Sequence, residues 1–275
     1  IFAEYSRGVA TSRDSVVYDY SNTALCTRVQ QFIDNYNSEI DRYRRCTEEE
    51  RENIDEFVNY SNIKWSRDLK LDLKRCRYTK FRQSGIRYSM YRPFNKKFLY
   101  FDRILNEEVY VFPKIFPSEP SEKENCVICC TNEAQIPFSV ILANVIPCLH
   151  IGGRQGQCFP FYTYEEDGSH WRENITDWAL QEFRSYYKDD SIEKWDIFYY
   201  VYGLLHHPGY RGKYADCLKR ELPRIPYAPD FRAFAQAGRD LAHWHLEYES
   251  IEPYPLQWVY ADGVPLSFRV EKMRL

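Results

Sequence analysis

The sequence has no uninterrupted apolar run of about 18 residues, the length that a helix needs to cross a bilayer. It also has no secretory signal pattern, so we expect no contact with a membrane. Catalytic motifs are missing as well: there is no phosphate loop ending in Gly-Lys-Ser/Thr, no dinucleotide fingerprint, no Asn/Asp-Pro-Pro-Tyr/Phe and no serine or cysteine nucleophile motif. We therefore expect this chain to be non-catalytic by itself.

Disulfide bonds are a further expected absence. The nine cysteines are an odd number spread along the chain, which argues against a disulfide framework and favours a reducing cytoplasm. The sequons at Asn59 and Asn174 would then carry no glycan. Because the chain starts at Ile1 and stops in the strand-like "PLSFRVEKMRL", we expect both ends to lie inside a longer polypeptide.

Positive charge is concentrated in one segment, although the net charge of the chain is −3. From Lys64 to Arg103 there are 13 Lys and Arg against three Asp, and nine aromatic residues are interleaved with them. The other 235 residues carry a net charge of −13. Such segregation predicts a local electrostatic footprint for a polyanion. The alternative is a hairpin or helix face whose aromatics are core and whose cations are only solvated.

The apolar pattern predicts an α+β fold, with a β-rich central region flanked by N-terminal and C-terminal helical segments. Helices are expected over 22–40, 48–60 and 66–78, and Thr47 and Glu50 have capping-box spacing. Strands are expected over 16–20 and through 85–163, where Pro93-Phe94-Asn95 divides a hairpin and Gly152-Gly153 marks a loop. Further helices are expected over 176–187, 192–207, 210–221 and 230–249.

Two adjacent histidines, His206 and His207, invite a metal-site interpretation. Neighbouring residues of a helix point about 100° apart, so the pair cannot chelate one ion. The helix that precedes them is apolar on nearly every side, which indicates burial. We therefore interpret both histidines as structural residues at a helix end.

Two enzymatic alternatives stay open. Cys126, Cys129, Cys148 and His150 could be drawn as a zinc ribbon of a hydrolase, although Val127 and Ile128 fill the knuckle. Asp68 and Asp72, each followed two residues later by Lys, could belong to a metal-dependent nuclease, although their segment has a helical pattern. A third alternative is a protein-interaction scaffold that docks other domains through acidic helices.

Four blocks resemble the target-recognition region of Type ISP restriction-modification enzymes and their helicase–methylase relatives. They are "GVATSRDSVVYDYS", "YRPFNKKFLYFDRILNEEVYVFPKIFP", "IPFSVILANVIPCLHIGGRQGQCFPFYTY" and "DIFYYVYGLLHHPGYRGKYADCLKRELPRIPYAPDF", and they extend over about residues 1–260. The family's Arg-Pro-Phe-Asp stands here as Arg92-Pro93-Phe94-Asn95, and Asn144 and Cys148 occupy a block that is usually Asp-rich. A carboxylate role in those blocks is therefore not carried over.

The resemblance implies one target-recognition domain over residues 1–275. Its parts would be a strand with helices over 1–80, a β-rich recognition part over 81–163 and a mainly helical part over 164–275. The implied partners are double-stranded DNA and an upstream adenine-N6 methyltransferase module of the same polypeptide. S-adenosylmethionine, ATP and Mg would serve the upstream methyltransferase, translocase and nuclease modules, and this chain would hold no cofactor.

The candidate DNA-binding residues fall into two groups. Phosphate contacts are predicted for Arg82, Arg87, Lys96, Lys97 and Arg103. Base or groove contacts are predicted for Ser12, Arg13, Arg92, Asn95, Arg154, Gln155 and Gln157, because Arg suits guanine while Asn and Gln suit adenine. For Arg13 an ion pair with Asp14 or another acid is the alternative.

Overall fold

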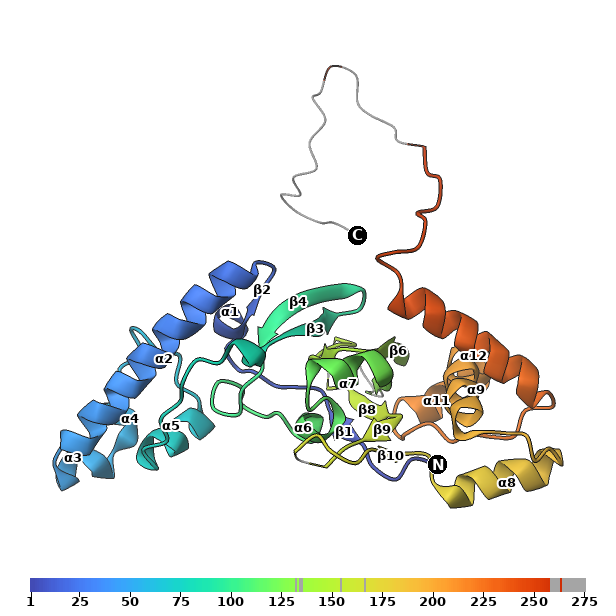
Figure 1. Cartoon of the computed structure of the whole chain (residues 1–275), viewed down its shortest axis with the longest axis horizontal. Helices are drawn as coiled ribbons and strands as arrows, with labels where there is room; N and C mark the ends of the chain where they lie inside the picture. Colours follow the sequence, from blue (N-terminus) through green and yellow to red (C-terminus); the bar gives the residue numbers. More distant parts are fainter. Residues whose placement is uncertain (132, 134–135, 154, 166, 258–262, 264–275) are drawn as a thin grey trace.

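The computed structural model describes residues 1–131, 133, 136–153, 155–165, 167–257 and 263. The predicted α+β fold is confirmed: helices come first, short strands occupy the centre, and helices follow (Figure 1). Figure 1 shows α2 and α5 on one side of the strands and α9 and α12 on the other. None of the described helices is long and apolar enough to cross a membrane. The predicted C-terminal strand lies outside the described residues.

The N-terminal part is built on the long helix α2 (Asn22–Arg45), capped by the Ser21 hydroxyl, which accepts from the Ala24 amide. The predicted helix over 48–60 is wrong in one respect, because it is divided into α3 (Glu48–Glu52) and α4 (Ile54–Phe57). Asn53 leaves the helical conformation and caps α4, whereas the capping box that begins α3 is present as predicted. Helix α5 (Arg67–Lys74) ends four residues earlier than predicted.

The central part contains three small sheets within the described residues. One has the order β2 (Tyr18–Asp19), β4 (Asn95–Tyr100), β3 (Ile86–Arg92) and β7 (Ile146–Pro147). A second has the order β1 (Ser6–Arg7), β8 (Gln157–Pro160), β5 (Val127–Thr131) and β6 (Ser139–Ala143), and the third pairs β9 (Tyr162–Thr163) with β10 (Arg172–Glu173).

Two predicted strand regions are wrong. Residues 16–17 belong to the helical turn α1 (Asp14–Val17), and only Tyr18–Asp19 is a strand. In the described structure, residues 104–126 form no strand. They contain the short helices α6 (Phe112–Ile115) and α7 (Glu119–Glu124) instead. Pro113 and Pro120 stand at the beginnings of these helices, where a missing amide hydrogen costs nothing.

The C-terminal part consists of α8 (Asp177–Tyr187), α9 (Lys194–His206), α10 (Pro208–Lys213), α11 (Ala215–Leu218) and α12 (Phe231–Leu246). Helix α9 is buried on nearly all sides, as predicted, and packs against α12. The two helices approach so closely that a Cβ on Gly238 would lie 1.9 Å from the Tyr199 carbonyl oxygen. The predicted helix over 210–221 is divided in two at Tyr214.

Strand β5 separates two hydrophobic cores. Its side chains alternate, so Val127 and Cys129 pack with α2 and the hairpin, while Ile128 and Cys130 pack with α9 and α12. Because both faces of one strand are covered, the N-terminal and C-terminal helices are held on opposite sides of the same sheet. This arrangement fixes the hairpin β3–β4 between them.

Candidate nucleic-acid interface

The hairpin β3–β4 carries the centre of the basic segment. Arg92 pairs with Asn95 across a two-residue turn, Pro93-Phe94, in which Phe94 has a φ of 56°. A bulky residue seldom adopts a positive φ. Here its ring packs against His245 and Tyr248, with centroid distances of 5.5 and 5.2 Å. The tip of the hairpin is therefore docked on the C-terminal end of α12.

Consecutive lysines of β4 point to opposite faces of the sheet, as strand geometry requires. The ammonium of Lys96 lies 3.0 Å from Glu249 Oε2 and 5.0 Å from the centre of the Tyr248 ring. The ammonium of Lys97 lies 4.0 Å from the Tyr91 ring centre and 4.7 Å from that of Tyr20. Lys97 has no carboxylate partner within the described chain, so its charge remains available.

Other polar groups gather around Lys97. The Tyr20 hydroxyl is 3.1 Å from Asn95 Oδ1 and 2.9 Å from its Nδ2, and the Tyr20 side chain is exposed. The Arg92 guanidinium stands 4.1 Å from the Tyr91 ring centre and donates to the Tyr91 carbonyl at 2.6 Å. We call these five residues, Tyr20, Tyr91, Arg92, Asn95 and Lys97, the tip surface. It combines cations on aromatic faces with the half-buried amide of Asn95.

Two predicted segments lie beside the tip surface. Ser12 is exposed with a φ of 54°, and two residues later Asp14 accepts a hydrogen bond from the Tyr91 hydroxyl at 3.0 Å. The loop after β7 is tied to β3, because the Cys148 amide donates to the Met90 carbonyl at 3.0 Å. Gln155 is exposed in that loop, Gln157 is half-buried in β8, and Arg154 lies outside the described residues.

Arg13 lies in the interior. Only 1% of it is exposed, and its guanidinium donates to the Leu105 carbonyl and the Ser66 hydroxyl, both at 2.6 Å. An ion pair with Glu107 at 3.4 Å completes its environment, and burial lowers the pKa of the guanidinium. The structure thus shows the ion-pair alternative, with Glu107 rather than Asp14 as the acid.

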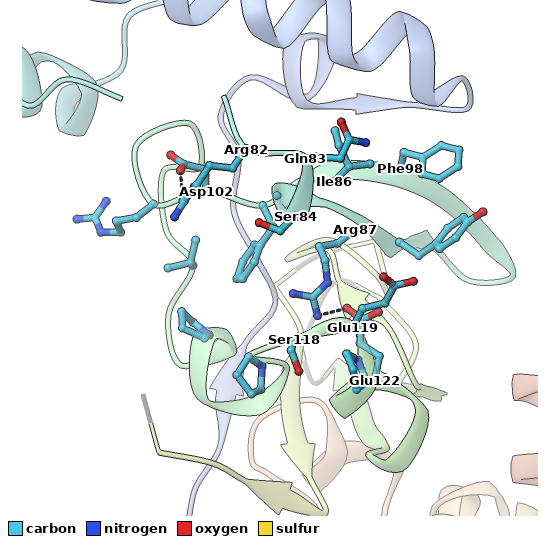
Figure 2. Close-up of a pocket in the computed structure, with 18 of the residues that line it drawn as sticks. Arg82, Gln83, Ser84, Ile86, Arg87, Phe98, Asp102, Ser118, Glu119 and Glu122 are labelled. Atoms are coloured by element: carbon cyan, nitrogen blue, oxygen red, sulfur yellow. Dashed lines mark hydrogen bonds and ion pairs between the residues drawn. The ribbon is translucent and has the colours of Figure 1, made fainter. Parts of the chain in front are cut away.

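The three remaining predicted arginines line a cleft of about 810 Å³ at the base of the hairpin (Figure 2). Arg82 pairs with Asp102 at 2.8 Å, and Arg103 is exposed without an ion pair inside the described chain. Arg87 is buried, pairs with Glu122 and donates to the Phe116 carbonyl at 3.3 Å.

The cleft presents both signs of charge. Figure 2 shows Glu119 and Glu122 beside the side chain of Arg87. Burial raises the pKa of Glu122 to about 7, against the opposing effect of Arg87. A phosphate that entered this cleft would meet carboxylates as well as guanidiniums, whereas the cations of the tip surface meet tyrosine rings. The charge of the tip surface is therefore less compensated than that of the cleft.

The zinc alternative finds no geometric support. Across the described residues no group of three or more His, Cys, Asp or Glu could hold a metal ion. All nine cysteines are free thiols, and burial raises the pKa of both Cys126 and Cys130 to about 12. His207 has a structural position, since its Nδ1 accepts from the Tyr210 amide at the start of α10. That agrees with the structural interpretation of His207.

The nuclease alternative also lacks a suitable arrangement. Asp68 and Asp72 lie on the helix α5 and not on a sheet. Asp68 pairs with Arg67 at 3.2 Å, and the buried Asp72 pairs with Arg77 at 2.9 Å. Both carboxylates are occupied by arginines of their own segment.

Sequence reasoning missed the two tyrosines of the tip surface. Tyr91 directly precedes Arg92, and alternation along β3 could have placed it with Lys97. The sequence does not predict that Tyr20 lies beside the hairpin, because this position depends on the pairing of β2 with β4.

Comparison with known proteins agrees with this architecture. The family model described as the Type ISP C-terminal specificity domain matches residues 1–275. Among curated proteins, none matches the chain. Similar solved structures include a DrdV–DNA complex studied by cryo-electron microscopy, with 39% identity and a TM-score of 0.85 over 94% of this chain.

Two further similar structures are described as Type ISP restriction-modification enzymes. A nuclease-deletion mutant of LlaGI in complex with a DNA substrate mimic has 33% identity and a TM-score of 0.81 over 93% of this chain. The ATP-dependent enzyme LlaBIII bound to DNA has 25% identity and a TM-score of 0.77 over 92%. The chain spans only 24% of the DrdV chain, 23% of the LlaGI chain and 16% of the LlaBIII chain. By fold and by sequence, this chain belongs to the Type ISP C-terminal specificity domain family.

Proposed function

We propose that the chain recognises double-stranded DNA in a sequence-specific manner through its tip surface. The observation that carries this proposal is the pair of cations Arg92 and Lys97, which stack on tyrosines without a carboxylate partner in the described structure. Between them on the hairpin, Asn95 offers the amide that suits adenine. The DNA in the three similar complexes supports the same partner.

The complete polypeptide is part of the proposal. The similar chains are at least four times longer than the match, so further modules are expected upstream. We infer an adenine-N6 methyltransferase that uses S-adenosylmethionine, and translocase and nuclease modules that use ATP and Mg. Recognition by this chain would hold one face of the duplex while the methyltransferase flips the target base. The cytoplasm would be the site of action.

Selection from random duplexes by the full-length protein tests the proposal. The wild type should enrich one sequence, and Arg92→Gln and Asn95→Ala should each relax the preference at a few positions while leaving others intact. Gln155→Ala should do the same if its loop enters a groove. Gln236→Ala is the matched control, because that exposed amide on α12 has Asp240 as its one side-chain partner among the residues that the structure describes.

The outcomes separate the alternatives. No enrichment by the wild type would contradict DNA recognition and favour the scaffold function, which binding to upstream modules would then have to explain. Enrichment that neither Arg92→Gln nor Asn95→Ala alters would leave the function intact but remove the tip surface as its site.

A further inference from the structure

The segment from Lys74 to Arg82, "KRCRYTKFR", joins α5 to the 3₁₀ turn η1 (Gln83–Gly85) and contains five cations and no acid. We call it the basic linker. All five cationic side chains are exposed, and Lys74, Arg75 and Lys80 have no ion pair anywhere in the described structure. Arg77 and Arg82 pair with aspartates, yet 49% and 64% of their side chains remain exposed. The linker is thus a concentrated and largely uncompensated positive surface.

The linker begins as a turn at the end of α5, where Cys76 has a φ of 49°, and its following residues are firmly held. The Asn37 side chain donates to the Thr79 carbonyl at 2.8 Å and accepts from the Thr79 amide at 3.2 Å. Further on, the Phe81 ring stacks on Tyr100, with centroids 5.6 Å apart, and the Arg82 amide donates to the Tyr100 hydroxyl. Because its backbone is already fixed against α2 and the sheet, binding a ligand would cost little ordering entropy.

Acids near the linker are already engaged. The Tyr78 hydroxyl donates to Asp41, and it also lies 3.4 Å from the Arg44 guanidinium, which adds a sixth cation from α2. Asp55 pairs with Lys70. Protein interfaces are enriched in Arg but need a central apolar area, and in the linker Tyr78 is the one exposed aromatic side chain. Binding of backbone phosphates needs only cations that can reach them. A polyanion therefore fits this surface better than a protein does.

The position of the linker relates it to the tip surface. The linker meets the hairpin at Tyr100, the end of β4 that lies away from the tip. The five steps of about 3.3 Å from Asn95 to Tyr100 place the linker roughly 17 Å, or about five base pairs, from that end of the tip surface. The linker itself covers at most about 26 Å, roughly eight base pairs. In Figure 1 α5 lies beyond the hairpin on the side away from α12.

We propose that the basic linker binds backbone phosphates of the duplex that flanks the recognised sequence. This inference rests on the proposed function, and it assigns to the N-terminal helices a sequence-independent contact outside the recognition site. Each cation that meets a phosphate should contribute about 0.9 to the slope of log affinity against log salt concentration.

Duplex length provides the test, with the full-length protein and its preferred sequence. One duplex has about 10 base pairs, and the other adds about 15 on each side, enough to pass the whole linker. The test variant is K74E/R75E/K80E. The control variant K213E/K219E/R220E makes the same change in net charge on exposed residues, Lys213 at the end of α10 and Lys219 and Arg220 just after α11. The test variant should bind the long duplex at least tenfold more weakly, and the short duplex like the wild type.

The salt dependence gives a second readout. On the long duplex the test variant should lower the slope by about 2 to 3, and the control variant should leave it within experimental error. Equal effects of the two variants, or equal losses on short and long duplexes, would overturn the proposal. Failure of the wild type to bind either duplex would instead overturn the proposed function. K74Q/R75Q/K80Q should show the same pattern with smaller losses, which makes the result independent of how well the glutamate variant folds.

Discussion

Replacing Arg13 by alanine should destabilise the fold without touching the DNA-binding surface. The guanidinium joins the Leu105 carbonyl, the Ser66 hydroxyl and the Glu107 carboxylate, and Ser66 also caps α5. Truncation of Arg13 to alanine leaves a cavity in which these three groups have lost their hydrogen-bond donor. It also leaves the Glu107 carboxylate without its cation. Losing one partner of a buried ion pair typically costs about 3–5 kcal/mol, so we expect the free energy of unfolding to fall by that amount.

Urea unfolding of the Arg13→Ala chain, followed by circular dichroism, measures this loss. Arg13→Lys should recover only a small part, because an ammonium cannot reproduce the fork that bonds two oxygens at once. Arg67→Ala is the control, since that side chain is 85% exposed and its ion pair should contribute less than about 1 kcal/mol. Unchanged stability of Arg13→Ala together with lost DNA binding would refute the reasoning and return Arg13 to the interface.

Three further predictions concern packing and pH. Gly238→Ala should lower the free energy of unfolding by about 1–3 kcal/mol, seen as a lower melting temperature, because α9 and α12 must separate. Gly212→Ala should not lower it, because the space around its Cβ is open. Burial, aided by His245 and Arg211, lowers the pKa of His206 to about 4. The stability that the neutral imidazole contributes should therefore be lost as pH falls from 6.5 to 4. In His206→Gln the urea midpoint should depend less on pH over that range. Burial raises the pKa of Glu122 to about 7, so the stability that its protonated form contributes should fall as pH rises from 4.5 to 7. The urea midpoint of Glu122→Gln should not show this decrease.

The fold could be predicted from the sequence where the determining interactions are local. The periodicity of α2, the Thr47–Glu50 capping box, the apolar α9 and the hairpin turn at Pro93-Phe94 are all signals within a few residues. The region over 104–126 was misassigned because alternating aromatic and polar residues resemble a strand. Its buried side chains, such as Phe112 and Phe116, pack instead from short helices into the core around α2.

The candidate site depended more on distant partners. Alternation in β4 predicts that Lys96 and Lys97 point to opposite faces, but the sequence does not reveal which face is covered. Glu249, which pairs with Lys96, lies 153 residues away along the chain. Arg13 is likewise held in the interior by contacts with the Leu105 carbonyl and the Glu107 carboxylate, more than 90 residues away along the chain. Contacts across such separations fix which cations stay free, and no local pattern contains them.

The most direct test of the account compares Lys96→Gln with Lys97→Gln in the full-length protein. The two changes remove the same charge from adjacent residues of one strand, on opposite faces of the sheet. Affinity for the preferred duplex should fall for Lys97→Gln, with a loss of about 0.9 in the salt slope, and should hold for Lys96→Gln. Equal losses for the two variants, or a loss for Lys96→Gln alone, would contradict recognition through the tip surface.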